Sequence, residues 1–221
     1  MTHHNEGDAV TATYALSISK MQQLTRDYAS FSQSRSGLGN VLGGVAGLLV
    51  FAALLLLGHG VLAAILTLGP TVIWLIGKEI IRRRLYRTFG DSRETWTASQ
   101  RRGHAIIVSI IGLVLAACAV LFAAYTIAGK ASWSTTIPYL IFCLVTPWIA
   151  WRYLRTANEL MLGCYLLFAS AIAVSGHAPD LLLFAAILPL YSLALIWVGL
   201  NEHRQFQELA TRLQTSDGAG G

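Results

Sequence analysis

The chain has 221 residues, of which 55% are hydrophobic and 12% are charged, and its formal net charge is +5. A water-soluble domain of this length needs far more charge on its surface, so the composition excludes that class and indicates that apolar side chains face lipid. The first forty residues are polar, and no other stretch forms a water-soluble block of domain size. We therefore predict one membrane domain.

The chain opens with a polar segment that does not fit a secretory signal. It lacks a basic start followed directly by an apolar core and a small-residue cleavage site. Within it, apolar residues recur at three- and four-residue steps, which places them on one helical face: Ile18, Met21, Leu24 or Thr25, Tyr28 and Phe31. We expect residues 1–36 to be a cytoplasmic segment with an amphipathic helix that lies on the membrane interface or shields the ends of other helices.

Six apolar runs follow, at about 41–57, 61–77, 105–128, 137–151, 159–175 and 180–200. Each run must be helical if it crosses a bilayer, because lipid offers the backbone no hydrogen-bond partners and the alternation of a barrel strand is absent. The first two runs have about 17 residues each, near the lower limit for a hydrocarbon core about 30 Å thick, so a re-entrant hairpin is their alternative. The predicted fold class is all-α, a polytopic membrane bundle of six transmembrane helices within residues 37–200.

The distribution of lysine and arginine predicts the orientation. If the N-terminus is cytoplasmic, fifteen of the sixteen basic residues lie on the cytoplasmic side and Lys130 alone lies outside. Basic residues in short loops stay on the cytoplasmic side of the membrane. We therefore expect a multi-pass protein of the plasma (inner) membrane with both termini in the cytoplasm.

The cytoplasmic loop 78–104 carries the main basic cluster, which consists of Lys78, Arg82, Arg83, Arg84, Arg87, Arg101 and Arg102. The cluster is first a topology signal. Basic residues beside a transmembrane helix also attract anionic lipid headgroups, at about 1 kcal/mol per residue. A cytoplasmic protein is the other candidate partner, and the sequence leaves the choice between lipid and protein open. No nucleic-acid module surrounds these residues, so we predict no nucleic-acid partner.

The tail, residues 201–221, has Phe206, Leu209 and Leu213 on one helical face. This spacing predicts an amphipathic cytoplasmic helix that extends the last span and has a disordered end.

Small and aromatic residues mark packing and interface positions in the predicted spans. Gly39, Gly43 and Gly47 recur every fourth residue and form a smooth face where another helix can approach, either within this chain or in a homo-oligomer. Tryptophan favours the membrane interface, and we expect interfacial anchors at Trp74, Trp96, Trp133, Trp148, Trp151 and Trp197.

Groups that carry chemistry are scarce. No charged residue lies in the middle of a predicted span, since Lys78 and Glu159 lie at ends, and this argues against proton-coupled transport. The sequence has no paired aspartates for a metal-bound diphosphate, no HExxH, no GxSxG and no phosphate loop. His59, His177 and Asp180 lie in predicted outer loops without a ligand spacing. We therefore expect no catalytic residue, no cofactor and no metal.

Three functional classes fit this pattern. The first is a non-catalytic membrane subunit that works with a cytoplasmic partner. The layout of an interfacial N-terminal helix, six spans, internal ends and a structured loop after the second span resembles that of the compact export permeases of ABC transporters. The resemblance implies a permease paired with a separate ATPase. The second class is a membrane anchor or sensor for a cytoplasmic regulator. The third is an intramembrane enzyme acting on lipid, with His104, Asn158, Glu159 and the arginines near the inner interface as headgroup contacts.

Overall fold

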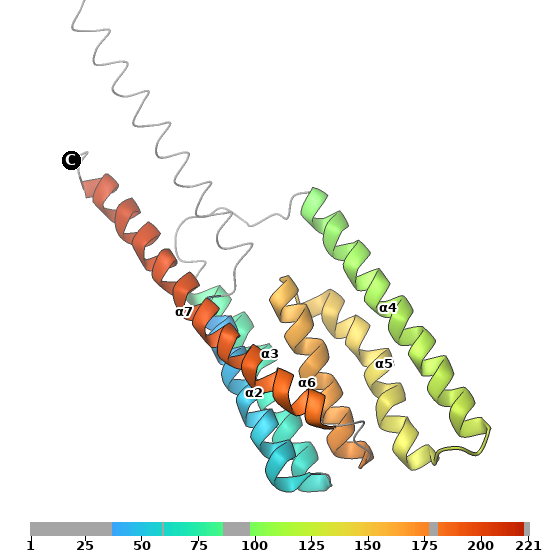
Figure 1. The fold of residues 1–221 in the computed structure, drawn as a ribbon. Helices are drawn as coiled ribbons and strands as arrows, with labels where there is room; N and C mark the ends of the chain where they lie inside the picture. The colour runs from blue at the N-terminus through green and yellow to red at the C-terminus, as the bar shows by residue number, and fades with distance from the viewer. Residues whose placement is uncertain (1–36, 59, 86–97, 177–180, 219–221) are drawn as a thin grey trace, which may run out of the picture.

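The computed structural model describes residues 37–58, 60–85, 98–176 and 181–218. Within these ranges the secondary structure is entirely helical, as the sequence predicts for an all-α protein. The helices, labelled as in Figure 1, are α2 (Leu38–Leu57), α3 (Val61–Leu85), α4 (Ala98–Ile127), α5 (Trp133–Tyr153), α6 (Ala157–Ser175) and α7 (Leu181–Gly218).

Length and composition identify candidate membrane spans among these helices. In the described part of the chain, the five helices α2 to α6 are long and apolar enough to cross a bilayer. Helix α7 contains the run predicted as the sixth span and continues without a break to Gly218. The structure thus supports a multi-pass helical membrane protein. The sixth span, the orientation and the amphipathic termini stay predictions, and the expected N-terminal helix lies outside the described residues.

The first two apolar runs form a pair of long helices. Helix α2 has 20 residues and α3 has 25, because α3 continues past the apolar run and through the arginines to Leu85. The turn between them contains Gly58 and Gly60, with φ angles of 64° and 122°. Side chains disfavour these angles, which explains why glycine occupies both positions. Both helices are of spanning length, which favours two crossings over a re-entrant hairpin.

The helices pack as two groups of three. In the first group α2 packs against both α3 and α7, and in the second group α5 packs between α4 and α6. Helix α6 joins the groups by packing against α3 and α2. We call this contact the seam. Helix α4 lies at the edge of the bundle (Figure 1) and is almost wholly exposed, so its apolar side chains are available to lipid.

Glycines set how closely α2 approaches its neighbours. A Cβ atom added at Gly44 would lie 2.5 Å from the backbone oxygen of Ser192 in α7, and one added at Gly47 would overlap the Ser192 hydroxyl. A Cβ atom at Gly43 would lie 2.7 Å from Nε1 of Trp74 in α3. Contacts within the chain therefore occupy the faces of Gly43 and Gly47, and α2 can approach its neighbours only because these positions lack side chains.

Trp74 is not an interfacial anchor, and that prediction is wrong. Its side chain is 1% exposed, and its Nε1 donates a hydrogen bond to the Gly39 carbonyl at 3.2 Å. The indole fits between α3 and α2 because Gly43 leaves room for it. Trp96 lies outside the described residues. The remaining tryptophans are exposed, as an anchor requires, namely Trp133, Trp148, Trp151 and Trp197.

Replacing Gly44 by alanine should lower the free energy of unfolding by about 1–3 kcal/mol, as overpacking of a close contact does. The added methyl group would meet the Ser192 backbone, which cannot rotate away. Gly69→Ala is the matched control, because Gly69 is also helical and a Cβ atom there would meet nothing within 4 Å. Thermal unfolding of the purified variants in detergent measures the difference. Equal stability of the two variants would contradict the described contact between α2 and α7.

Candidate functional site

Positive side chains gather at one end of the bundle, where α3 and α5 end and α4 and α6 begin. We call it the basic end. The cations placed there by these helix termini are Lys78, Arg82, Arg83, Arg84, Arg101, Arg102, Arg152 and Arg155. Lys130 lies at the opposite end, in the turn between α4 and α5.

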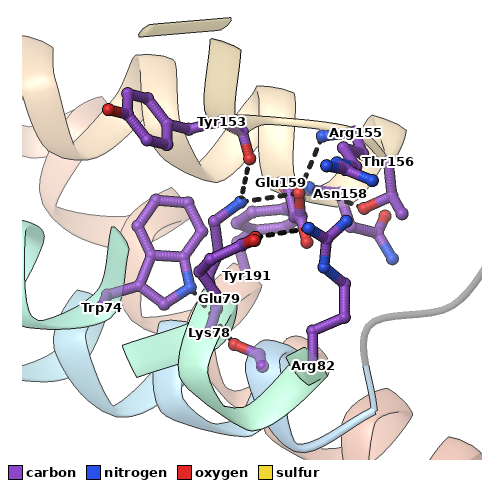
Figure 2. A network of polar contacts seen from close by, with 11 residues as sticks. Trp74, Lys78, Glu79, Arg82, Tyr153, Arg155, Thr156, Asn158, Glu159 and Tyr191 are labelled. Atoms are coloured by element: carbon purple, nitrogen blue, oxygen red, sulfur yellow. Dashed lines mark hydrogen bonds and ion pairs between the residues drawn. The ribbon is translucent and has the colours of Figure 1, made fainter. Parts of the chain in front are cut away.

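A buried ion pair crosses the seam at the basic end. Lys78 Nζ of α3 lies 2.7 Å from Glu159 Oε2 of α6, and the two side chains are 5% and 9% exposed. The same ammonium donates a hydrogen bond to the Tyr153 carbonyl at 2.6 Å (Figure 2). It also lies 5.1 Å from the centroid of the Trp74 ring. One lysine thereby connects the end of α3 to the end of α5 and the beginning of α6.

Local capping positions the Glu159 carboxylate. Thr156 is the N-cap of α6, and its hydroxyl accepts a hydrogen bond from the Glu159 backbone N–H at 3.2 Å. Glu159 Oε2 in turn accepts one from the Arg155 backbone N–H at 2.8 Å. This arrangement resembles a capping box and places a negative charge at the positive end of the helix dipole. The carboxylate therefore has two partners besides its favourable position on the helix.

A second carboxylate neutralises part of the predicted basic cluster. Glu79 accepts from Arg82 Nη2 at 2.5 Å and from Arg83 Nε at 2.8 Å, at i,i+3 and i,i+4 positions of α3. Arg83 is 66% exposed, whereas Arg82 is 17% exposed. The Nε atom of Arg82 is buried and has no hydrogen-bond partner in the described part of the chain. These two arginines are thus partly engaged within α3.

The other arginines of the predicted basic cluster are not engaged in the way that Arg82 and Arg83 are. Arg84, Arg101 and Arg102 are exposed, and they form no ion pair within the described ranges. Arg101 and Arg102 belong to α4 at the edge of the bundle, so the fold does not gather the whole cluster into one pocket. Arg87 lies outside the described residues.

The sequence interpretation also missed the contact of the Glu202 carboxylate with α2. Its Oε2 atom accepts from the Gly37 backbone N–H at 2.8 Å and from Asn40 Nδ2 at 3.0 Å. A side chain of α7 thereby caps the first turn of α2, as an N-cap residue of that helix would do. In addition, the Tyr191 hydroxyl of α7 donates to the Asn158 carbonyl of α6 at 3.2 Å.

The residues expected for lipid chemistry, His104, Asn158 and Glu159, all lie in the described structure. The Glu159 carboxylate is held by Lys78 and the backbone. His104 of α4 packs against Trp151 of α5, with 5.9 Å between the ring centroids. No group of three metal-binding side chains occurs among the described residues. The outer-loop candidates His59, His177 and Asp180 lie outside them.

Comparison with protein-family models, with curated proteins and with solved structures finds no match to this chain. The site is therefore interpreted from its own geometry. It combines a buried, fully partnered ion pair with arginines that retain unused donors or an exposed charge. Such an arrangement is suited to holding helices in register and to binding anionic groups.

Replacing Lys78 by methionine should lower the free energy of unfolding by about 3–5 kcal/mol, because it leaves the Glu159 charge buried without its partner. The double variant Lys78→Met/Glu159→Gln should recover part of this loss, since the amide is uncharged and still accepts from the Arg155 backbone. Arg83→Met is the control, and it should cost less than about 1 kcal/mol because that ion pair is exposed. Equilibrium unfolding in mixed micelles supplies the values. A double variant that is no more stable than Lys78→Met would contradict the coupling between the two charges.

Proposed function

We propose that this chain is a non-catalytic, multi-pass subunit of the plasma (inner) membrane, with its basic end in the cytoplasm, and that it works with a soluble protein there. Most concretely, it is the permease component of a transporter whose ATPase is a separate chain. The observation that carries this proposal is the collection of cations at one end of the bundle, whereas Lys130 is the one lysine or arginine that the described residues place at the other end. Positive residues of short loops remain on the cytoplasmic side.

The basic end has a surface suited to an acidic partner protein. Arg84, Arg101 and Arg102 are exposed charges without ion pairs in the described ranges. At the same end of the bundle, the buried pair of Lys78 and Glu159 fixes the positions of α3 and α6. Exposed charges on a fixed scaffold steer a complementary partner and set its orientation. This supports docking at the basic end.

The polar groups of the seam are distributed unevenly along α3. Thr67 and Thr71 are buried on the α3 face that also carries Lys78, since these residues follow at helical spacing. Both hydroxyls donate to carbonyls of α3 itself, so they do not connect the two helix groups. At the end opposite the basic end, the Gly60 N–H donates to the Ala173 carbonyl across the seam. In the described part of the chain, the hydrogen bonds across the seam therefore lie at its two ends.

The orientation is testable by thiol labelling in intact cells. We replace the native Cys118, Cys143 and Cys164 by alanine and introduce either Lys130→Cys or Arg84→Cys. A reagent that cannot cross the membrane should label the Lys130 position and should reach the Arg84 position only after permeabilisation. The reverse pattern would place the basic end outside and overturn the proposal.

The partner is testable by purification in a mild detergent. A protein with ATPase activity should copurify with the wild-type chain, and Arg84→Gln/Arg101→Gln/Arg102→Gln should reduce its recovery by about tenfold, as expected for three exposed charges. Lys130→Gln removes a charge from the other end and should leave recovery unchanged. Thiol labelling of the triple variant verifies that its orientation is retained. Copurification of a signalling protein, or of no protein, would contradict the permease proposal.

A further inference from the structure

We propose that the hairpin formed by α4 and α5 binds one anionic phospholipid at the basic end, with the lipid phosphate between Arg101 and Arg152 and an acyl chain along the exposed face of α4. We call this surface the hairpin site. It goes beyond the proposed function, because it requires only a bilayer. It also includes Arg152 and two tryptophans of α5, which the proposed docking of a soluble partner does not use.

A ring contact brings the two arginines to one level. Helices α4 and α5 are antiparallel neighbours joined by the turn at 128–132 (Figure 1), and at the basic end His104 packs against Trp151 with 5.9 Å between the ring centroids. Arg101 lies one turn before His104 on the same side of α4, and Arg152 follows Trp151 in α5. Because the helices are antiparallel, both arginines lie beyond this ring contact, on the side away from the turn.

The charges of these arginines are not neutralised by the described part of the chain. Residues 98–153 contain no aspartate or glutamate. Arg101 and Arg152 are exposed and form no hydrogen bond or ion pair in the described ranges. The carboxylates of the neighbouring helices are engaged, since Glu79 pairs with arginines of α3 and Glu159 pairs with a lysine. Two guanidinium groups are therefore free to bind phosphate oxygens, which their planar fork suits.

Exposed tryptophans place the hairpin site at the depth of lipid headgroups. Trp148 and Trp151 lie in the last two turns of α5, and they are 61% and 53% exposed. Tryptophan prefers the boundary between hydrocarbon and headgroups. Because the arginines and the tryptophans are all on the surface, a lipid reaches them directly from the bilayer.

The apolar surface next to the arginines favours a lipid over other anions. In the turns of α4 that follow His104, Ile106, Ile107 and Ile110 are exposed. A phospholipid meets both surfaces at once, because its phosphate meets the arginines and its acyl chain meets the isoleucines. A free phosphate ester or an acidic soluble protein would use the arginines and leave the apolar surface uncovered. Basic residues at the end of a transmembrane helix attract anionic headgroups in this way.

The test measures lipid binding by the full chain without a protein partner. The purified protein is delipidated in detergent, titrated with phosphatidylglycerol or phosphatidylcholine, and analysed by native mass spectrometry. We expect one tightly bound phosphatidylglycerol and no comparable phosphatidylcholine. Arg101→Gln/Arg152→Gln should weaken the phosphatidylglycerol affinity by about thirtyfold, as the loss of two interfacial arginines implies. Arg84→Gln/Lys130→Gln makes the same change of charge outside the hairpin site and should alter this affinity by less than about twofold.

A second variant separates loss of charge from loss of structure. Arg101→Lys/Arg152→Lys keeps both charges and should retain the phosphatidylglycerol affinity within about threefold. Three results would overturn the hairpin site: equal binding of the two lipids, equal weakening in the two glutamine variants, or a loss in the lysine variant as large as that in Arg101→Gln/Arg152→Gln.

Two further results identify a different ligand. Competition by millimolar glycerol 3-phosphate, which has the phosphate but no acyl chain, would assign the arginines to a soluble phosphate ester and reject the lipid. Loss of a copurifying protein from Arg101→Gln/Arg152→Gln with unchanged phosphatidylglycerol binding would assign them to the soluble partner. That result would reject the hairpin site and leave the proposed function standing.

Discussion

The buried ion pair between Lys78 and Glu159 is the contact on which the arrangement of the helices depends. Charges at the edge of a hydrocarbon environment persist only when each polar atom has a partner. Here the lysine has the carboxylate and the Tyr153 carbonyl, and the carboxylate has the lysine and the Arg155 N–H. The pair therefore fixes one relative position of the two helix groups. The ion pair contributes more to the alignment of the helices than to net stability, because the desolvation of the charges offsets most of their attraction.

Close packing of α2 extends this constraint to the rest of the basic end. The glycines of α2 allow α3 and α7 to approach, and the approach brings side chains of both helices within reach of the first turn of α2. Trp74 donates to the Gly39 carbonyl, and Glu202 accepts from the Gly37 N–H. The beginning of α2 is thus held from two sides. A fixed basic end offers its exposed arginines in a constant geometry, whether they meet lipid phosphates or an acidic protein surface.

The membrane environment determines how much of the fold and of the basic end could be predicted from the sequence. The helices follow from the apolar runs, since lipid admits few alternatives, and the basic end follows from the positions of lysine and arginine. The pairing of Arg82 and Arg83 with Glu79 was within reach, because i,i+3 and i,i+4 spacing places them together. The contacts of Glu159 with Lys78 and of Glu202 with α2 were not, because these partners are 81 to 165 residues away. A capping pattern predicts where a carboxylate begins a helix, but not which distant lysine it meets.

The most direct test of the ion pair is a distance measurement between α3 and α6 in lipid bilayers. Spin labels at Arg84 and Ala157, two exposed positions beside the pair, report the distance across the seam in a chain without native cysteines. One narrow distance distribution is expected when Lys78 is present, and a broad distribution is expected after Lys78→Met. A broad distribution in the unsubstituted pair, or a narrow one that is unchanged by Lys78→Met, would contradict the central role of this contact.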